Sequence, residues 1–522
     1  MLERTRAFIS QNRAALILAI FSIAGFAVIW INTPWGIGVG YDSIFYLSAA
    51  DNVLSGLGLS RLDGYGNTIP LTHFPPFYSI SLAGLSFITG IETDLAARII
   101  SAVLFGWLVG LTGWLVYRYT RSLLGCILGA SLILVSPVLL DVSFIAMSEL
   151  LFLVILLLTV HFLNKFLMNG KMIDLVISAG LTSFVYLTRY VGITAVALGG
   201  LSLLIFRSSS LGKKFRDVVI FGTISLLPML VFYLRNWYLT GSMTNRIISF
   251  HPPTEAQIKQ GISTLSNWLL PARINSSLQL IVLVLFLFAV AALIVINDLR
   301  SKKESDSQSM LMGVNQFVIL LIMYALIYLF IVFASLTFFD ASTRLNDRIL
   351  SPLYVIGIIA GLITVWNSAL FEDHVLIRSG IIALCLMFLG INLLRGFDVS
   401  NSMRKEGKGF SGRDWRSSET IAAISHLPPN TLMFSNEAFA IYYLTGNSAN
   451  WIPENYDPVK GQAEVRYKQR IGEMRSEIVE KSGALVIFNS ITKHNVYAPI
   501  DELTAGLSRW MNGADGAIYH AP

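Results

Sequence analysis

The sequence predicts an α-helical polytopic membrane protein with a small soluble α/β domain at its C-terminal end. Of its 522 residues, 54% are hydrophobic and only 13% are charged, whereas soluble domains usually carry about 25% charged residues. The apolar residues also form long, nearly uncharged blocks, such as 14–31, 278–296 and 317–336. A block of this length crosses about 30 Å of hydrocarbon as one helix.

Apolar blocks of this kind predict about eleven transmembrane helices. The first is read as a retained helix, because it is longer than the apolar core of a signal peptide and no small-residue cleavage site ends it. The predicted spans are 14–32, 95–117, 124–140, 148–166, 173–188, 191–206, 217–234, 278–297, 314–336, 349–366 and 379–395.

Basic residues set the orientation of these spans. Every short loop assigned to the cytoplasm contains Lys or Arg, for example 207–216 and 300–303, which is the distribution that the positive-inside rule requires. The N-terminus is therefore predicted inside. The segment 33–94 and the tail after 396 then lie outside, in a multi-pass protein of the cell membrane.

This topology divides the chain into a transmembrane domain, residues 1–395, and an extracytoplasmic α/β domain, residues 396–522. In the second, NTLMFSN (430–436) and GALVIFNS (483–490) have the composition of buried strands. Residues 437–446 and 466–481 are predicted helices. No nucleotide-binding loop or metal motif is present in this tail.

The first outer loop, residues 33–94, is predicted to carry two interfacial helices. In YDSIFYLSAADNVLSG, apolar residues recur at helical spacing from Ile44 to Leu54, as in a helix that lies in the membrane interface. In THFPPFYSISLAGLSFITG, two prolines precede an apolar run that is too short to span the membrane comfortably.

Ionisable residues close to the spans are the candidate site residues, because a charge at a helix centre costs roughly 2.5–3.5 kcal/mol. Several are arginines on the outer side, against the positive-inside bias. The guanidinium group binds phosphate oxygens bidentately and keeps its charge, so the set suits a phosphate-bearing ligand. The candidates are Asp42, His73, Glu149, Arg189, Arg235, Arg246, Arg344 and Arg348.

Other partners receive less support. The net charge is +6, but the basic residues lie in short loops between spans, so no nucleic-acid partner is predicted. The two cysteines, Cys126 and Cys385, fall inside predicted spans, which argues against a disulfide framework or a thiolate metal site. No cofactor is predicted, and a divalent metal ion is left open.

Several motifs together resemble the GT-C superfamily of polyprenyl-phosphate-dependent glycosyltransferases. GYDSIFYLSAADNVLSG and THFPPFYS resemble its first outer loop, and MSELLF, TRYVG, LRNWYLTG and NDRILSPLY follow in the same order, over about residues 30–360. Relatives include protein O-mannosyltransferases and aminoarabinose transferases, which are similar to glycosyltransferase family 39.

The resemblance implies that Asp42 is the catalytic residue, a general base in transfer of a sugar from a polyprenyl-phosphate carrier. Ser43 stands where family members often carry a second acidic residue. The acceptor would be a hydroxyl of a glycan, lipid or protein at the outer face of the bilayer. We expect Arg235 and Arg348 to approach each other near Asp42 and to bind the carrier phosphate.

Simpler roles are open for the same residues. Asp42 could cap an interfacial helix, Glu149 could be stabilised by a helix dipole, and arginines could reach toward lipid headgroups. The alternative function is a transporter or flippase of a lipid-linked or anionic solute, which would favour charges at mid-membrane and an internal repeat. A receptor-like or scaffolding protein is a third possibility.

Overall fold

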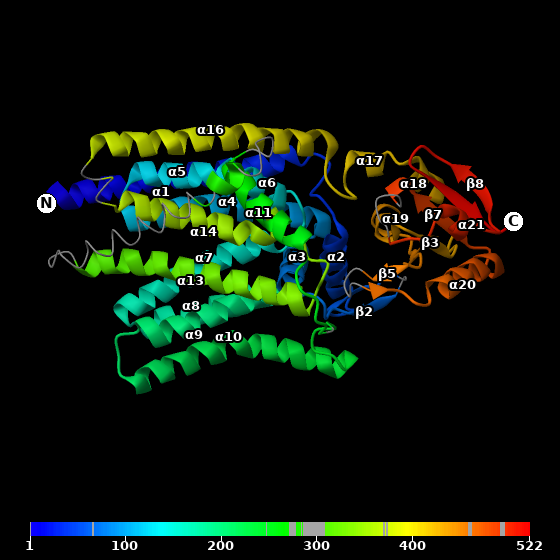
Figure 1. Ribbon diagram of the computed structural model, residues 1–522, viewed down its shortest axis with the longest axis horizontal. Coiled ribbons are helices and arrows are strands. Elements are labelled where there is room, and N and C mark those ends of the chain that lie inside the picture. Colours follow the sequence, from blue (N-terminus) through cyan, green and yellow to red (C-terminus); the bar gives the residue numbers. More distant parts are fainter. Residues whose placement is uncertain are drawn as a thin grey trace.

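The computed structural model shows a bundle of long helices that run alongside one another, with the sheet-containing C-terminal domain at one end (Figure 1). The described residues are 2–522 without 65–66, 247, 271–277, 283, 285–307, 369–370, 372–373, 458–461 and 491–495.

Within the described residues, seven helices are long and apolar enough to cross a membrane. They are α1 (Leu2–Asn32), α4 (Thr93–Thr120), α7 (Glu149–Asn169), α10 (Leu211–Thr240), α13 (Gln308–Phe338), α14 (Asp347–Trp366) and α16 (Val375–Glu406). This confirms the predicted helical membrane fold.

An eighth span forms if α5 (Leu123–Leu134) and α6 (Pro137–Ser143) are counted together. The two meet at a bend of 53°, where the Ser136 hydroxyl caps the new helix by accepting from the Leu139 amide and Pro137 occupies its first turn. Two further apolar helices, α8 (Met172–Thr188) and α9 (Ile193–Phe206), are shorter. The predicted segment 278–297 lies mostly outside the described residues.

The outer helices of the bundle expose apolar side chains, as helices in contact with lipid do. On α16, for example, Leu384 and Leu394 are largely exposed, while the inner helices α4, α7 and α14 bury residues such as Phe105, Phe152 and Ile359. The apolar surface of α16 therefore faces the membrane, and the large aromatic residues fill the interior.

The segment 33–94, for which an outer position was predicted, contains α2 (Tyr41–Leu54), the hairpin β1 (Ser60–Leu62) and β2 (Thr68–Pro70), and α3 (Phe77–Thr89). The two helices predicted there are present. The apolar side of α2, including Ile44 and Leu47, is covered by protein and packs in one cluster with Tyr78 of α3 and Phe439 of the C-terminal domain. In contrast, α3 leaves Phe87 exposed.

The C-terminal domain is built on a five-stranded sheet in the order β4-β3-β7-β9-β8. The strands β3 (Met433–Ser435), β4 (Asn450–Trp451) and β7 (Ala484–Phe488) are parallel, and β9 (Gly516–His520) is antiparallel to β7 and to β8 (Ser508–Asn512). Every residue of β7 is buried, because packing layers cover both faces of the sheet.

Helices and small strands complete this domain. The helices are α17 (Arg413–Arg416), α18 (Glu419–Ile424), α19 (Ala438–Thr445), α20 (Tyr467–Glu480) and α21 (Ile500–Thr504), and the strands β5 (Tyr456–Asp457) and β6 (Gln462–Ala463) pair with each other. Both predicted strands and both predicted helices are thus present. Outside this domain, α11 (Glu255–Leu269) precedes α13 in the chain.

Three distant segments meet in a short main-chain structure that we call the central ladder, residues 38–39, 144–146 and 408–410. The amide of Gly38 donates to Phe144 O at 2.8 Å, and on the other side the amide of Phe410 donates to Val39 O at 2.7 Å. A Cβ at Gly38 would lie 2.5 Å from Phe144 O, so this approach requires glycine. The ladder fixes the start of α2, the approach to α7 and the start of the C-terminal domain relative to one another.

Candidate functional site

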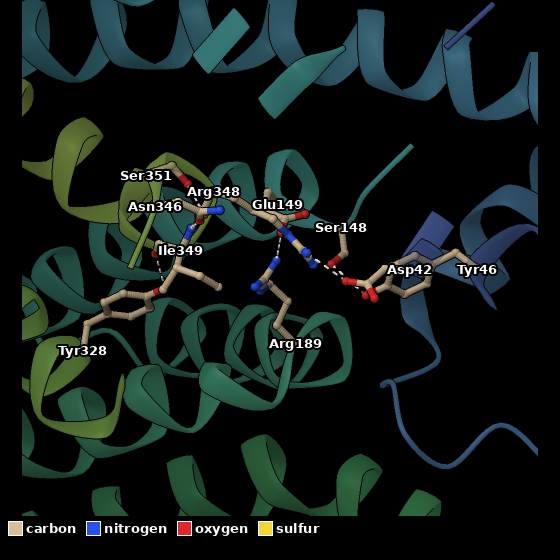
Figure 2. A network of polar contacts seen from close by, with 10 residues as sticks. All are labelled: Asp42, Tyr46, Ser148, Glu149, Arg189, Tyr328, Asn346, Arg348, Ile349 and Ser351. Carbon is tan, nitrogen blue, oxygen red and sulfur yellow. Dashed lines mark hydrogen bonds and ion pairs between the residues drawn. The ribbon is translucent and has the colours of Figure 1, made fainter. Parts of the chain in front are cut away.

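Asp42 is the second residue of α2, and its carboxylate meets an arginine from α14. Arg348 Nη1 lies 2.8 Å from Asp42 Oδ2 (Figure 2). About one third of each side chain is exposed, 30% for Asp42 and 31% for Arg348. The pair is therefore held together and still accessible to a ligand.

Behind this pair lies Glu149, the first residue of α7, which is 3% exposed. Its Oε1 accepts from Arg348 Nε at 2.5 Å and forms an ion pair with Arg189. Figure 2 shows both guanidinium groups directed at this carboxylate. Two carboxylates and two arginines thus form one network, which we call the acid–arginine cluster: Asp42, Glu149, Arg189 and Arg348.

The start of α14 positions Arg348 in this cluster. The Asn346 side chain caps the helix by accepting from the Ile349 amide at 3.3 Å, and the Tyr328 hydroxyl donates to Ile349 O at 2.7 Å. The neighbouring Asp347 accepts from Trp268 Nε1 at 2.7 Å. The backbone that carries Arg348 is consequently tied to α11 and α13.

Arg189 comes from the break between α8 and the short helix η1 (Tyr190–Gly192). Its backbone is extended, with φ −148° and ψ 140°, which ends α8 and turns the side chain toward Glu149. Beside the cluster, the hydroxyls of Tyr46 and Ser148 lie 3.2 Å apart. Burial raises the pKa of Tyr46 to about 12, so this phenol remains neutral.

Arg235 has a different environment. Its guanidinium donates to Leu71 O at 3.0 Å and to Leu59 O, two carbonyls that flank the hairpin β1–β2, and to Asn236 Oδ1. No contact in the described part of the chain joins Arg235 to Arg348. The hydrogen-bond partners of Arg235 are two carbonyls and Asn236, and its predicted approach to Arg348 stays a prediction.

Arg246 and His73 lie near each other and near Tyr190. The Arg246 guanidinium lies 5.3 Å from the centre of the Tyr190 ring, and the Tyr190 hydroxyl donates to Thr72 O next to His73. Burial, and then the nearby Arg246, lower the pKa of His73 to about 4, so this imidazole is neutral at pH 7. Arg344 is exposed, with no ion pair to a described residue.

Sequence reasoning missed the part that the C-terminal domain plays here. Tyr41, next to Asp42, donates a hydrogen bond of 2.6 Å to Glu437, which is 396 positions away in the chain. Lys408 similarly pairs with Asp141. No local pattern marks either contact. A search of the described residues for three or more His, Cys, Asp or Glu side chains placed to hold a metal ion finds no such group.

The comparisons with known proteins identify the architecture. No protein family and no curated protein matches the sequence. Among solved structures, ArnT from Cupriavidus metallidurans bound to undecaprenyl phosphate superposes with a TM-score of 0.54 at 10% identity, over 96% of this chain and 97% of ArnT. An oligosaccharyltransferase from Archaeoglobus fulgidus gives 0.54 at 13% identity, over 96% and 72%.

The chain has the GT-C fold. The arabinofuranosyltransferase AftD from Mycobacteria shares this fold, with a TM-score of 0.53 at 13% identity over 97% of this chain and 40% of AftD. The resemblance seen in the sequence is thereby confirmed at the level of the fold. The match extends over the GT-C membrane bundle and the C-terminal domain, because nearly the whole chain is covered.

Proposed function

We propose that this protein is a membrane glycosyltransferase that moves a sugar from a polyprenyl-phosphate carrier to an acceptor hydroxyl at the outer face of the cell membrane. The observation that carries the proposal is the accessible Asp42 carboxylate, held by Arg348 in front of the buried Glu149. Structures with the same fold were solved with undecaprenyl phosphate and with a dolichol-phosphate bound, which supports a lipid phosphate as the carrier.

In the proposed reaction, Asp42 acts as the general base. An acceptor O–H loses its proton to Oδ1 of Asp42, while the acceptor oxygen forms a bond to C1 of the sugar. The bond between C1 and the phosphate oxygen breaks, and its electron pair leaves with the polyprenyl phosphate. Because this is a single displacement, the configuration at C1 is inverted.

The phosphate gains negative charge as it leaves, and preorganised cations stabilise that charge. Arg348 forms an ion pair with Asp42, and its accessible guanidinium is kept in place by Glu149. Arg246 and Arg344 supply further positive charge on the outer side in this proposal, and the neutral His73 is a hydrogen-bonding group. Arg235 has the separate role of holding the two residues that flank the hairpin β1–β2.

The position of the cluster supports transfer at one membrane face over transport. Asp42 lies in the first turn of α2, Glu149 begins α7, Arg348 lies in the first turn of α14, and Arg189 ends α8. All four side chains are thus at helix ends. Charged groups along a transport path would lie near the middle of the spans.

The test is loss of a lipid-linked donor. The full-length protein in nanodiscs is mixed with a panel of polyprenyl-phosphate-linked sugars and an extract of envelope lipids and glycans, and free polyprenyl phosphate is measured. We expect Asp42→Asn to lower turnover by about 10²–10⁴. The matched control is Asp51→Asn on the same helix, because Asn can still accept the Thr93 hydroxyl that Asp51 binds at 2.8 Å.

Two results would contradict the proposal. A folded parent protein that consumes none of the donors refutes glycosyl transfer. A folded Asp42→Asn protein that works at the parental rate removes Asp42 from catalysis, and product with retained configuration at C1 rules out the single displacement.

A further inference from the structure

We propose that the C-terminal domain positions the catalytic base, with Glu437 acting on Asp42 through Tyr41. This inference rests on the proposed function, because it assigns Glu437 as a positioning residue for that reaction. Tyr41 immediately precedes Asp42, and its hydroxyl donates to Glu437 Oε2 at 2.6 Å. The contact joins the first turn of α2 directly to the sheet domain.

Glu437 is held in a fixed geometry for this contact. It is 3% exposed, and its other oxygen, Oε1, accepts from the Ser490 hydroxyl at 2.7 Å. Among the described residues no cation pairs with it, so two neutral hydroxyls satisfy its two oxygens. Charge-assisted hydrogen bonds of this kind are short and directional, and they fix the hydroxyl of Tyr41 in turn.

The backbone under Glu437 is equally constrained. The preceding residue, Asn436, pairs with the main chain of Phe488 on β7 through two bonds of 3.1 Å and 2.8 Å. The amide of Glu437 donates to Ser435 Oγ at 3.0 Å. Because β7 lies in the middle of the sheet, the bonds of Asn436 anchor the residue before Glu437 to the central strand of the C-terminal domain.

Tyr41 is held by its ring as well as by its hydroxyl. Phe410 contacts the ring edge-to-face, with centroids 5.3 Å apart, and Trp451 lies 6.0 Å away. Phe410 also belongs to the central ladder, which fixes Val39 just before α2. Burial and the neighbouring Glu437 carboxylate raise the pKa of Tyr41, so the phenol keeps the proton that it donates.

These contacts matter because the start of α2 lacks the usual side-chain cap. The N-cap is Gly40, which has no side chain to accept the free amides of the first turn. Ser43 Oγ accepts from the Gly40 amide at 3.0 Å, and Tyr41 and the central ladder add further restraint at this end. Asp42 reaches Arg348 across only 2.8 Å, and a displacement of about 1 Å at a reacting group can lower the rate by about 10²-fold.

A second bond across the same junction provides a matched control. The Tyr443 hydroxyl of α19 donates to Asp94 Oδ2 of α4, also at 2.6 Å. It joins the same two domains with the same chemistry, but it holds α4 and not the turn that carries Asp42. If such bonds only attach the domains to each other, Tyr41→Phe and Tyr443→Phe should have equal effects.

The experiment compares donor turnover by four variants of the full-length protein. We expect Tyr41→Phe and Glu437→Ala to lower kcat by about 10- to 100-fold with little change in KM for the lipid-linked donor. Glu437→Gln should retain most activity, because the amide oxygen still accepts from Tyr41. Tyr443→Phe should resemble the parent. Equal losses in both Tyr→Phe variants would overturn the inference, and so would a Glu437→Gln variant as inactive as Glu437→Ala.

Hydrogen–deuterium exchange separates this inference from the proposed function. We expect amides of residues 38–47 to exchange faster in Tyr41→Phe than in the parent, and Tyr443→Phe to leave them unchanged. If the parent transfers no sugar, the proposed function fails while exchange still reports on the restraint. Unchanged exchange at 38–47 in Tyr41→Phe refutes the positioning role whether or not the parent is active.

Discussion

Replacing Glu149 by Gln removes a buried negative charge that faces both Arg189 and Arg348. The two arginines are affected unequally. Arg348 is 31% exposed and retains its ion pair with Asp42 at 2.8 Å. Water and the Asp42 carboxylate therefore still stabilise its positive charge. Arg189 is 16% exposed, and Glu149 is the carboxylate with which it pairs among the described residues, so its charge is left buried.

The expected cost follows from that inequality. Breaking a buried ion pair by removing one partner costs about 3–5 kcal/mol. In Glu149→Gln only Arg189 is left without a carboxylate to balance its charge, and the Gln oxygen can still accept one N–H from a guanidinium group. We therefore expect Glu149→Gln to lower the free energy of unfolding by about 3 kcal/mol, at the low end of this range.

The assay is denaturant unfolding of the purified protein in mixed micelles, arranged as a double-mutant cycle. Arg189→Gln in the Glu149→Gln background leaves neither charge unpaired, so the double variant should be more stable than Glu149→Gln alone. The control is Glu255→Gln, which also lies in a first helical turn but in an exposed pair with Lys259, and should cost under about 1 kcal/mol. Additivity within about 0.5 kcal/mol would refute the reasoning.

Three further variants test separate contacts. Arg348→Ala should weaken donor binding and lower kcat, and Lys should restore only part of the loss, because an ammonium group lacks the planar fork; equilibrium binding of polyprenyl phosphate checks this. Gly409→Ala should lower the free energy of unfolding by about 1–3 kcal/mol or more, because φ at Gly409 is +63° and a Cβ there would meet Val39 O. Denaturant unfolding measures this change in stability. His73→Gln should make stability less dependent on pH between about 4 and 6.5: the folded-state pKa of His73 is lowered to about 4, so the parent loses stability as the pH falls through this window. Thermal unfolding at pH 4.5 and 7 compares the two proteins.

The membrane fold was predictable because its signal is local. An apolar run of about 20 residues has few alternatives to a spanning helix. Residues of the acid–arginine cluster could also be predicted from the sequence, because Glu149 and Arg348 are charged residues beside apolar runs. Neither motif predicts that these two side chains contact each other, because they lie 199 positions apart in the chain.

Other features depend on tertiary packing that a periodic pattern does not specify. The spacing of Ile44 and Leu47 correctly predicts a helix with a buried face, but the cover is Tyr78 and Phe439, where a membrane interface was expected. Arg235 matched a phosphate ligand by charge, and the structure gives it carbonyl partners from 164 and 176 positions away. Periodicity indicates that a helix face is buried, but it does not specify which residues or which medium cover that face.

The central ladder also determines when, during synthesis of the protein, the residues before α2 can form all of their contacts. Ile37, which adjoins it, accepts a hydrogen bond from Ser411, 374 positions later in the chain. At about 5–20 residues per second, the ribosome needs roughly 20–75 s to make the intervening residues. During that interval all four residues of the acid–arginine cluster are synthesised, while residues 38–39 before Asp42 still lack their pairing with residues 408–410. Since Asp42 is the base in the proposed reaction, that base gains its full restraint only after the last quarter of the chain has been made.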